Sequence, residues 1–144
     1  MILISPYSKE LISKKQNHKN YPYWAELISK IDEPIIQIGV EGEVQLVDDF
    51  RKNLPISELQ KLIRECRIWI ACDSFLQHLA WDEGKRGIVL WGPSDPLIFG
   101  YPENINLLKD RSHLTPNQFL WHENGEHKNE RFVEPKEVLE HLNK

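Results

Sequence analysis

A stretch in the second half of the chain combines residue types that together can bind an anion. Asp73 and Ser74 follow an apolar run, and His78 comes four residues after Ser74. A second apolar run ends in a rigid turn that contains Ser94 and Asp95. Free backbone N–H groups and the positive dipole end make a helix start favourable for phosphates. The stretch therefore predicts an anion site at Ser74, beside the turn.

The residues after Ser74 are predicted to form a short helix with two different faces. One face carries Ser74, Gln77, His78 and Trp81, and the other carries Phe75, Leu76, Leu79 and Ala80. We expect the second face to pack on a sheet and the first to face a ligand. Alternatively, Ser74 only caps the helix and His78 is a surface residue. A hydrolytic Ser74–His78 pair is disfavoured, because no G-x-S-x-G motif surrounds the serine.

Other polar residues are candidates for the same edge of the protein. Glu43 and Glu41 follow a strand-like run, where a carboxylate can accept hydrogen bonds from ribose hydroxyls, although most glutamates in turns are only solvated. A polar loop near the start of the chain carries a cluster of basic residues: Lys9, Lys14, Lys15, His18 and Lys19. This basic loop is either simply solvated or forms a cationic rim for an anionic small molecule. Three irregularly spaced histidines are predicted to be surface residues and not metal ligands: His113, His122 and His127.

Length and composition limit the class of protein. The 144 residues are expected to form one domain, 1–144, and the net charge of −4 argues against nucleic-acid binding. Cys66 and Cys72 are expected to be buried thiols. The apolar run at Met1–Ser5 is too short for a signal peptide, and no run has membrane-spanning length, so we expect a cytoplasmic protein.

Short apolar runs alternate with helical patterns, which favours an α/β fold with a doubly wound parallel sheet. The strands are expected within 2–5, 35–39, 44–47, 68–72, 87–90 and 105–108. Helices are expected after Asn20, which can cap the first of them, after Pro55, over 74–82, and after Pro135. The segment 109–131 is predicted to be irregular.

The order of these motifs resembles the donor-binding half of glycosyltransferase family 9, which includes the ADP-heptose:lipopolysaccharide heptosyltransferases. The resemblance is carried by Asp73-Ser74-x-x-x-His78-Leu79-Ala80 followed by Gly92-Pro93-Ser94-Asp95-Pro96. Weaker pieces in the same order are Ile2–Pro6, Lys19–Trp24, Gly39–Glu43 and Pro135–Val138. It spans nearly the whole chain but only half of the usual family protein. It implies a Rossmann-like fold, similar to the C-terminal half of a GT-B glycosyltransferase.

The resemblance also implies roles for particular residues. Ser74 and the adjacent N–H groups would receive the diphosphate of a nucleotide sugar, and His78 would reach the diphosphate or the sugar. Lys19, with Ser8 or Lys9, would neutralise phosphate charge, Glu43 would hold the ribose, and Asp73 would orient the loop or a sugar hydroxyl. Ser94 and Asp95 complete the predicted donor site.

Two departures from the family pattern affect the expected activity. Phe75 stands where the family commonly has glycine. The half that brings the acceptor and the catalytic carboxylate has no counterpart here. We therefore expect a donor-binding glycosyltransferase-like chain that acts with a complementary partner chain or as a homo-oligomer, without a cofactor. The alternative is a non-catalytic nucleotide-sugar-binding or regulatory module.

Overall fold

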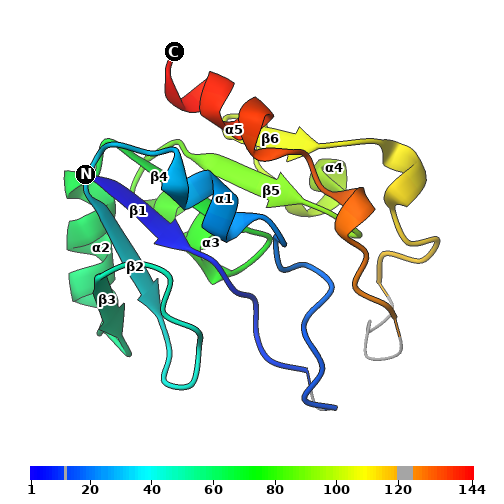
Figure 1. Cartoon of the computed structure of the whole chain (residues 1–144), viewed down its shortest axis with the longest axis horizontal. Coiled ribbons are helices and arrows are strands. Elements are labelled where there is room, and N and C mark those ends of the chain that lie inside the picture. The colour runs from blue at the N-terminus through cyan, green and yellow to red at the C-terminus, as the bar shows by residue number, and fades with distance from the viewer. Residues whose placement is uncertain (12, 120–124) are drawn as a thin grey trace.

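The computed structural model describes residues 1–11, 13–119 and 125–144 and contains one six-stranded sheet (Figure 1). All neighbouring strands are parallel, in the order β3-β2-β1-β4-β5-β6. The strands are β1 (Ile2–Ser5), β2 (Ile35–Gly39), β3 (Asp49–Lys52), β4 (Ile68–Cys72), β5 (Ile88–Trp91) and β6 (Ile105–Leu108). The prediction of a doubly wound parallel α/β sheet is thus confirmed.

Both faces of the sheet are covered, which explains why its strands are apolar at successive positions. Ile2 and Ile4 of β1 point into one core, and Leu3 points into the other. The first core is closed by α1 (Trp24–Ser29) and α5 (Pro135–Leu142). The second is closed by α2 (Ile56–Glu65) and α3 (Phe75–Asp82). The two buried thiols, Cys66 and Cys72, are free, as the sequence predicts.

The third strand is not where the sequence places it. The sequence predicts a strand at Val44–Val47, but β3 is formed by Asp49–Lys52, and 44–47 belongs to the loop that precedes it. The buried side chain of Gln37 explains the difference. Its Nε2 donates to the Val44 carbonyl oxygen at 2.9 Å, and its Oε1 accepts from the Leu46 N–H at 2.7 Å. These bonds satisfy the loop backbone without a neighbouring strand.

The first helix begins later than predicted, at Trp24, and no side chain caps it within the described residues. Asn20, the expected cap, instead accepts a hydrogen bond from the Ser8 N–H through Oδ1, at 2.8 Å. The loop between β1 and α1 is the dark blue chain that extends below the sheet in Figure 1. The side chain of Asn20 therefore folds this loop back on itself.

The end of the chain alternates short helices with irregular segments. It contains α4 (Pro96–Phe99), two single 3₁₀ turns at Arg111–His113 and Asn129–Arg131, and α5. None of the helices in the described part of the chain has the length and apolar character that crossing a bilayer requires.

Candidate functional site

The order of the strands marks one place at the carboxyl edge of the sheet. Connections run to one side from β1 and to the other side from β4, so the loops after these two neighbouring strands diverge. Ligands of open α/β sheets bind in the crevice at such a switch point. Ser8 lies in the first loop, and Asp73 and Ser74 lie in the second.

Hydrogen bonds tie the two diverging loops together. The Ser8 hydroxyl donates to the carbonyl oxygen of Asp73 at 2.8 Å and lies 3.3 Å from the Cys72 sulfur. Cys72 is fully buried, and this burial raises its pKa to about 11. The thiol therefore stays protonated at neutral pH and is unsuited to act as a nucleophile. Ser8 and Cys72 fix the position of the Asp73 backbone.

An ion pair joins Lys19 to Asp73 across the same junction. Lys19 Nζ lies 3.1 Å from Asp73 Oδ2, and Gln77 Nε2 donates to Asp73 Oδ1 at 2.7 Å. The Asp73 side chain is 9% exposed, whereas that of Lys19 is 32% exposed. The carboxylate is thus covered on the protein side, and the ammonium reaches solvent. The structure brings together three predicted residues here, Ser8, Lys19 and Asp73, with Ser74 adjacent.

Helix α3 starts beside this ion pair without a side-chain cap among the described residues. Ser74 is the N-cap residue, but its hydroxyl donates back to the Cys72 carbonyl oxygen at 3.2 Å. Ser74 thus occupies the N-cap position, as the alternative expects, but its side chain makes no capping hydrogen bond. The N–H groups of the first turn keep their capacity to bind an acceptor from outside.

The predicted faces of α3 are wrong at two positions. Gln77, placed on the ligand face, is fully buried, and Phe75, placed on the sheet face, is 56% exposed. The physical reason is the buried carboxylate of Asp73, which needs a donor from the same side of the helix. Gln77 supplies this donor one turn later, so the helix turns Phe75 outward.

His78 lies on the exposed face of α3 and contacts a residue that sequence reasoning missed. Its Nδ1 is 2.8 Å from the Tyr101 hydroxyl oxygen, and Tyr101 stacks on Trp81 with ring centroids 4.6 Å apart. Tyr101 follows α4, in a turn that carries no local signal for this contact. The described contacts do not join His78 to Lys19 or to Ser74.

Ser94 and Asp95 lie in the turn between β5 and α4, and the contacts of Asp95 hold this turn. Asp95 Oδ1 accepts from the Leu97 N–H at 2.9 Å and caps α4. Both Asp95 oxygens also accept from Arg111, at 3.1 and 2.7 Å. The Arg111 hydrogen bonds hold the pKa of Asp95 below its usual value. Ser94 is buried. Arg111, which pairs with Asp95, is a residue that sequence reasoning missed.

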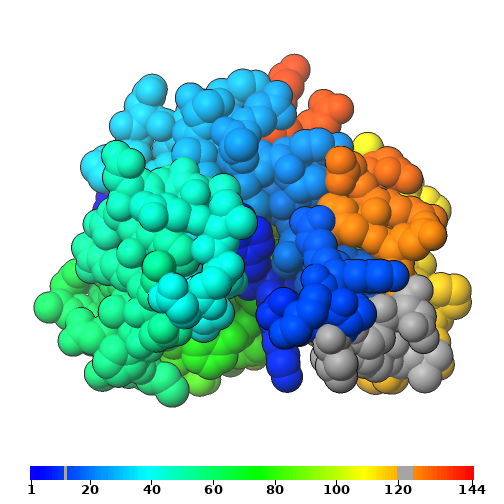
Figure 2. All heavy atoms as spheres, turned by 60° about the horizontal axis from the view of Figure 1, so that its bottom comes forward, coloured from blue at the N-terminus to red at the C-terminus, as the bar shows by residue number. Residues whose placement is uncertain are grey.

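Glu43 lies in the loop after β2, whereas Lys9 lies in the loop after β1 that also holds Ser8 and Lys19. Glu43 Oε1 accepts from the Val40 N–H at 2.6 Å, and burial of the side chain raises its pKa. Lys9 is exposed, and its carbonyl oxygen accepts from the side chain of Asn17 at 2.8 Å. Figure 2 shows a furrow between the cyan loop after β2, which holds Glu43, and the blue loop after β1. No described hydrogen bond or ion pair joins Glu43 or Lys9 to the Lys19–Asp73 pair.

The histidines expected at the surface differ in their surroundings. His127 is partly buried: its Nε2 is 2.7 Å from the Asn20 carbonyl oxygen, and its ring stacks on Phe132. This corrects the surface prediction for His127. His113 is only partly exposed, and His122 lies outside the described residues. Across the described ranges, no group of three or more His, Cys, Asp or Glu side chains is arranged to hold a metal ion.

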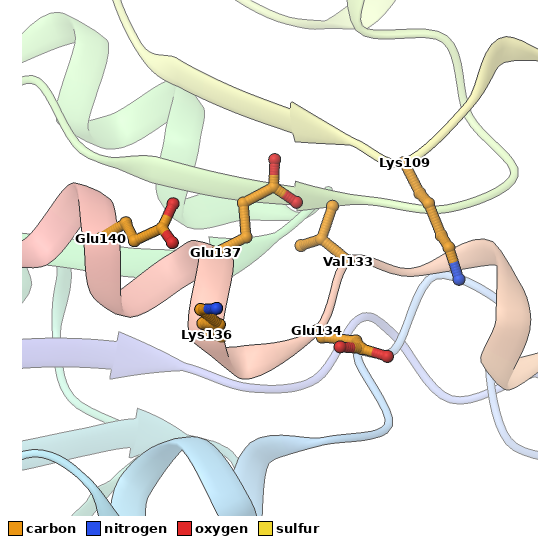
Figure 3. Close-up of a pocket in the computed structure, with 6 residues that line it drawn as sticks. All are labelled: Lys109, Val133, Glu134, Lys136, Glu137 and Glu140. Carbon is orange, nitrogen blue, oxygen red and sulfur yellow. The ribbon is translucent and has the colours of Figure 1, made fainter.

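Neither Lys19 nor Asp73 lines either of two hollows in the surface. One has a volume of about 380 Å³, and Figure 3 shows the residues that line it. They are Lys109, Val133, Glu134, Lys136, Glu137 and Glu140. The other has about 340 Å³ and is lined by Lys15, Gln16, His18, Gly125, Glu126 and His127. The second includes Lys15 and His18 of the basic loop, and neither includes a residue to which the family resemblance gives a role.

Residues 52–128 match the family model described as glycosyltransferase family 9 (heptosyltransferase), which covers more than half of the chain. The chain belongs to glycosyltransferase family 9. The matched range of this family 9 chain includes Asp73, Ser74, His78, Ser94 and Asp95, which carried the resemblance in the sequence. A search of curated proteins gave no match.

Solved structures show the same fold for nearly all of the family 9 chain. The E. coli ADP-heptose LPS heptosyltransferase II and the iron-containing dodecameric glycosyltransferase TibC from enterotoxigenic E. coli H10407 each match with a TM-score of 0.66 and 19% identity. Each match covers 99% of this chain and 45% of the other. TibC in complex with ADP-D-beta-D-heptose matches with a TM-score of 0.64 and 16% identity, over 99% and 44% of the two chains. The family 9 chain thus spans less than half the length of these proteins.

Proposed function

We propose that this family 9 chain binds the diphosphate of a nucleotide-sugar donor at the switch point between β1 and β4. The observation that carries the proposal is the position of Lys19, which Asp73 holds at 3.1 Å beside the uncapped start of α3. A lysine ammonium has three N–H donors, so two remain after the bond to Asp73. Together with the first-turn N–H groups of α3, they suit a pair of phosphates.

Asp73 has the same charge as a phosphate, and its contacts reduce the repulsion. One of its oxygens accepts from Gln77 and the other faces Lys19, so its charge is offset on the protein side. Its proposed role is to hold the cation in place. We further propose that Ser8 stabilises the Lys19–Asp73 pair and that Lys9 adds positive charge beside the diphosphate. Glu43 is proposed to bind the ribose, and His78 to reach the sugar together with Tyr101.

Sugar transfer also needs a base to deprotonate the acceptor hydroxyl. Asp95 is a poor base, because Arg111 stabilises its charged form and its Oδ1 caps α4. Asp73 is occupied by Lys19 and Gln77. We propose that a complementary chain or a second copy of this chain supplies the acceptor and the base. Because one similar structure is a complex with ADP-D-beta-D-heptose, ADP-heptose is the first donor to test.

Isothermal titration of the full chain tests donor binding. The titrants are ADP-heptose, and ADP, UDP and GDP with their common sugar conjugates. We expect saturable binding of at least one of them, weakened by Lys19→Ala and unchanged by Lys15→Ala in the same loop. Absence of binding to all of them at millimolar concentration would reject the proposal.

The second candidate function is donor binding without transfer, as in a sequestering or regulatory module. The engagement of both Asp73 and Asp95 favours it, because neither carboxylate is available as a base. The test is mass spectrometry of the donor and a panel of sugar acceptors after incubation with the purified chain. Detection of a transferred sugar would eliminate this candidate.

A further inference from the structure

Gln77 is a polar side chain in a place where an apolar one would pack without cost. It lies on α3 between Leu76 and Leu79, and all three face the interior. Gln77 is 0% exposed, and its Oε1 has no hydrogen-bond partner among the described residues. A buried amide that satisfies only part of its hydrogen-bonding capacity is unfavourable for folding. Packing therefore does not explain the glutamine.

The one described hydrogen bond of the Gln77 side chain points to another explanation. Its Nε2 donates to Asp73 Oδ1 at 2.7 Å, one helical turn before it in the sequence. The other carboxylate oxygen, Oδ2, lies 3.1 Å from Lys19 Nζ. The two oxygens thus have different partners, one inside the protein and one at its surface.

Lys19 depends on this arrangement for its position. Its flexible side chain rises from a loop and is 32% exposed, so holding it in one place costs conformational entropy. A carboxylate that itself turned between rotamers would hold the ammonium poorly. The backbone of Asp73 is fixed by the Ser8 hydroxyl, and its carboxylate orientation is fixed by Gln77.

We propose that Gln77 is a positioning residue: it fixes the Asp73 carboxylate so that Lys19 is held at the start of α3, ready for an anion. Gln77 lies behind Asp73 and touches no ligand in this arrangement. The consequence for anion affinity rests on the proposed function, whereas the effect on Lys19 does not depend on any ligand.

The test compares Gln77→Met, which keeps the length of the side chain and removes the donor, with a control at another buried amide. Asn104 is the control: it is 9% exposed, its Oδ1 accepts from the Gly87 N–H at 3.2 Å, and it precedes β6 at the opposite edge of the sheet. Asn104→Leu also removes a buried amide but leaves Asp73 and Lys19 untouched. Melting temperatures of both variants establish that they are folded, and Gln77→Leu replaces Gln77→Met if the latter aggregates.

The first measurement uses the ligand-free protein. Amine acylation by an N-hydroxysuccinimide ester is followed at Lys19 and Lys15 by peptide mass spectrometry. In the parent protein and in Asn104→Leu, we expect Lys19 to react several-fold more slowly than Lys15. In Gln77→Met, the two rates should come within about twofold. A Lys19 rate that stays at the parent value in Gln77→Met would overturn the proposal.

The second measurement is calorimetric titration with inorganic pyrophosphate. We expect three- to tenfold weaker binding in Gln77→Met and unchanged binding in Asn104→Leu. If the parent protein does not bind pyrophosphate or any nucleotide sugar, the proposed function fails, and the acylation rates still decide the role of Gln77. If Lys19 is released in Gln77→Met but pyrophosphate binds as tightly as before, Gln77 does not prepare Lys19 for an anion and the inference is wrong.

Discussion

Two helices start at the same edge of the sheet, and the carboxylate next to each start is used differently. At α4, Asp95 is the N-cap residue, and its carboxylate binds the Leu97 N–H and Arg111. At α3, Asp73 lies one residue before the N-cap Ser74, and its carboxylate binds Lys19 and Gln77 instead. The start of α4 is thus closed by its own aspartate, whereas the start of α3 stays open beside a lysine.

The two helix starts differ in the position of the aspartate by one residue relative to the N-cap. This one residue separates a structural turn at α4 from a candidate anion site at α3. An aspartate at the N-cap position accepts from one first-turn N–H and puts its negative charge where an external anion would bind. An aspartate one position earlier cannot reach those groups and can hold a cation near them. The same residue type therefore predicts opposite effects of mutation in the two places.

The largest effect on binding is expected from Lys19→Ala. A charge-assisted hydrogen bond contributes about 1.5–3 kcal/mol, so affinity for pyrophosphate or a nucleotide sugar should fall about ten- to hundredfold. Calorimetric titration measures the loss, and a melting curve shows that the variant is folded. Lys15→Ala, in the same exposed loop, is the matched control and should bind as the parent does. Equal affinities of Lys19→Ala and Lys15→Ala for pyrophosphate would contradict the conclusion that the start of α3, unlike that of α4, binds an anion.

Asp95→Ala should have the opposite pattern, a loss of stability with anion binding unchanged. Removing an N-cap aspartate lowers the free energy of unfolding by about 1–2 kcal/mol. Asp95→Asn, which keeps a capping oxygen, should be less destabilising. Chemical denaturation measures both variants. A pyrophosphate affinity that falls together with stability would place Asp95 in the binding site and contradict the comparison.

The stability that Asp95 provides should depend on pH. Arg111 lowers the pKa of Asp95 in the folded protein, below the value of about 3.9 for an unfolded aspartate. This contribution is therefore complete above about pH 4 and is lost as the pH falls through the folded-state pKa. The gap in unfolding free energy between the parent and Asp95→Ala should narrow between pH 7 and pH 3. A constant gap would mean that the charge of Asp95 is not what stabilises this turn.

Phe75 tests whether the open helix start is partly shielded. Its side chain is 56% exposed at the first residue of α3, the position where the resemblance described above leads us to expect glycine. Phe75→Gly should let a phosphate approach the backbone more closely and raise pyrophosphate affinity about two- to fivefold, the size of one weak hydrogen bond. Phe75→Ala is the control that removes the ring but keeps a side chain at Cβ. Weaker binding in Phe75→Gly would indicate that the ring itself contacts the ligand.

The fold could be predicted from the sequence because the central strands are apolar runs buried on two faces. The runs at 2–5, 35–39 and 68–72 became β1, β2 and β4 with at most small changes of boundary. The third strand could not be placed, because β3 is a polar edge strand and the apolar Val44–Val47 packs as a loop on Gln37. A buried side-chain amide that replaces strand pairing leaves no periodic signal in the sequence.

The candidate site was predictable where neighbours in sequence meet, and not where distant residues meet. Ser74 at a helix start follows from local pattern, and the resemblance pointed to Lys19. The bonds from Arg111 to Asp95 and from Tyr101 to His78 join residues far apart in the sequence and required the structure. The bond from Gln77 to Asp73 is local but was also missed, because the helical pattern placed Gln77 on the ligand face. Asp73 and Asp95 look alike in sequence, and only their partners show which of them holds a cation at an open helix start.

The smallest effect is expected at Glu43, whose carboxylate neither caps a helix nor pairs with a cation in the described structure. Burial raises its pKa above the unfolded value of about 4.3, so its ionised form is less favourable in the folded protein. The stability associated with its protonated form is complete below about pH 4 and is lost as the pH rises through the folded-state pKa. Glu43→Gln keeps an acceptor for the Val40 N–H and cannot ionise. It should therefore be more stable than the parent at pH 7, by less than about 1 kcal/mol, and equal to it at pH 4.

Urea denaturation at both pH values measures this difference. A variant that is less stable at pH 7 would show that the Glu43 charge has a cationic partner, which would make this loop resemble the Asp73 region.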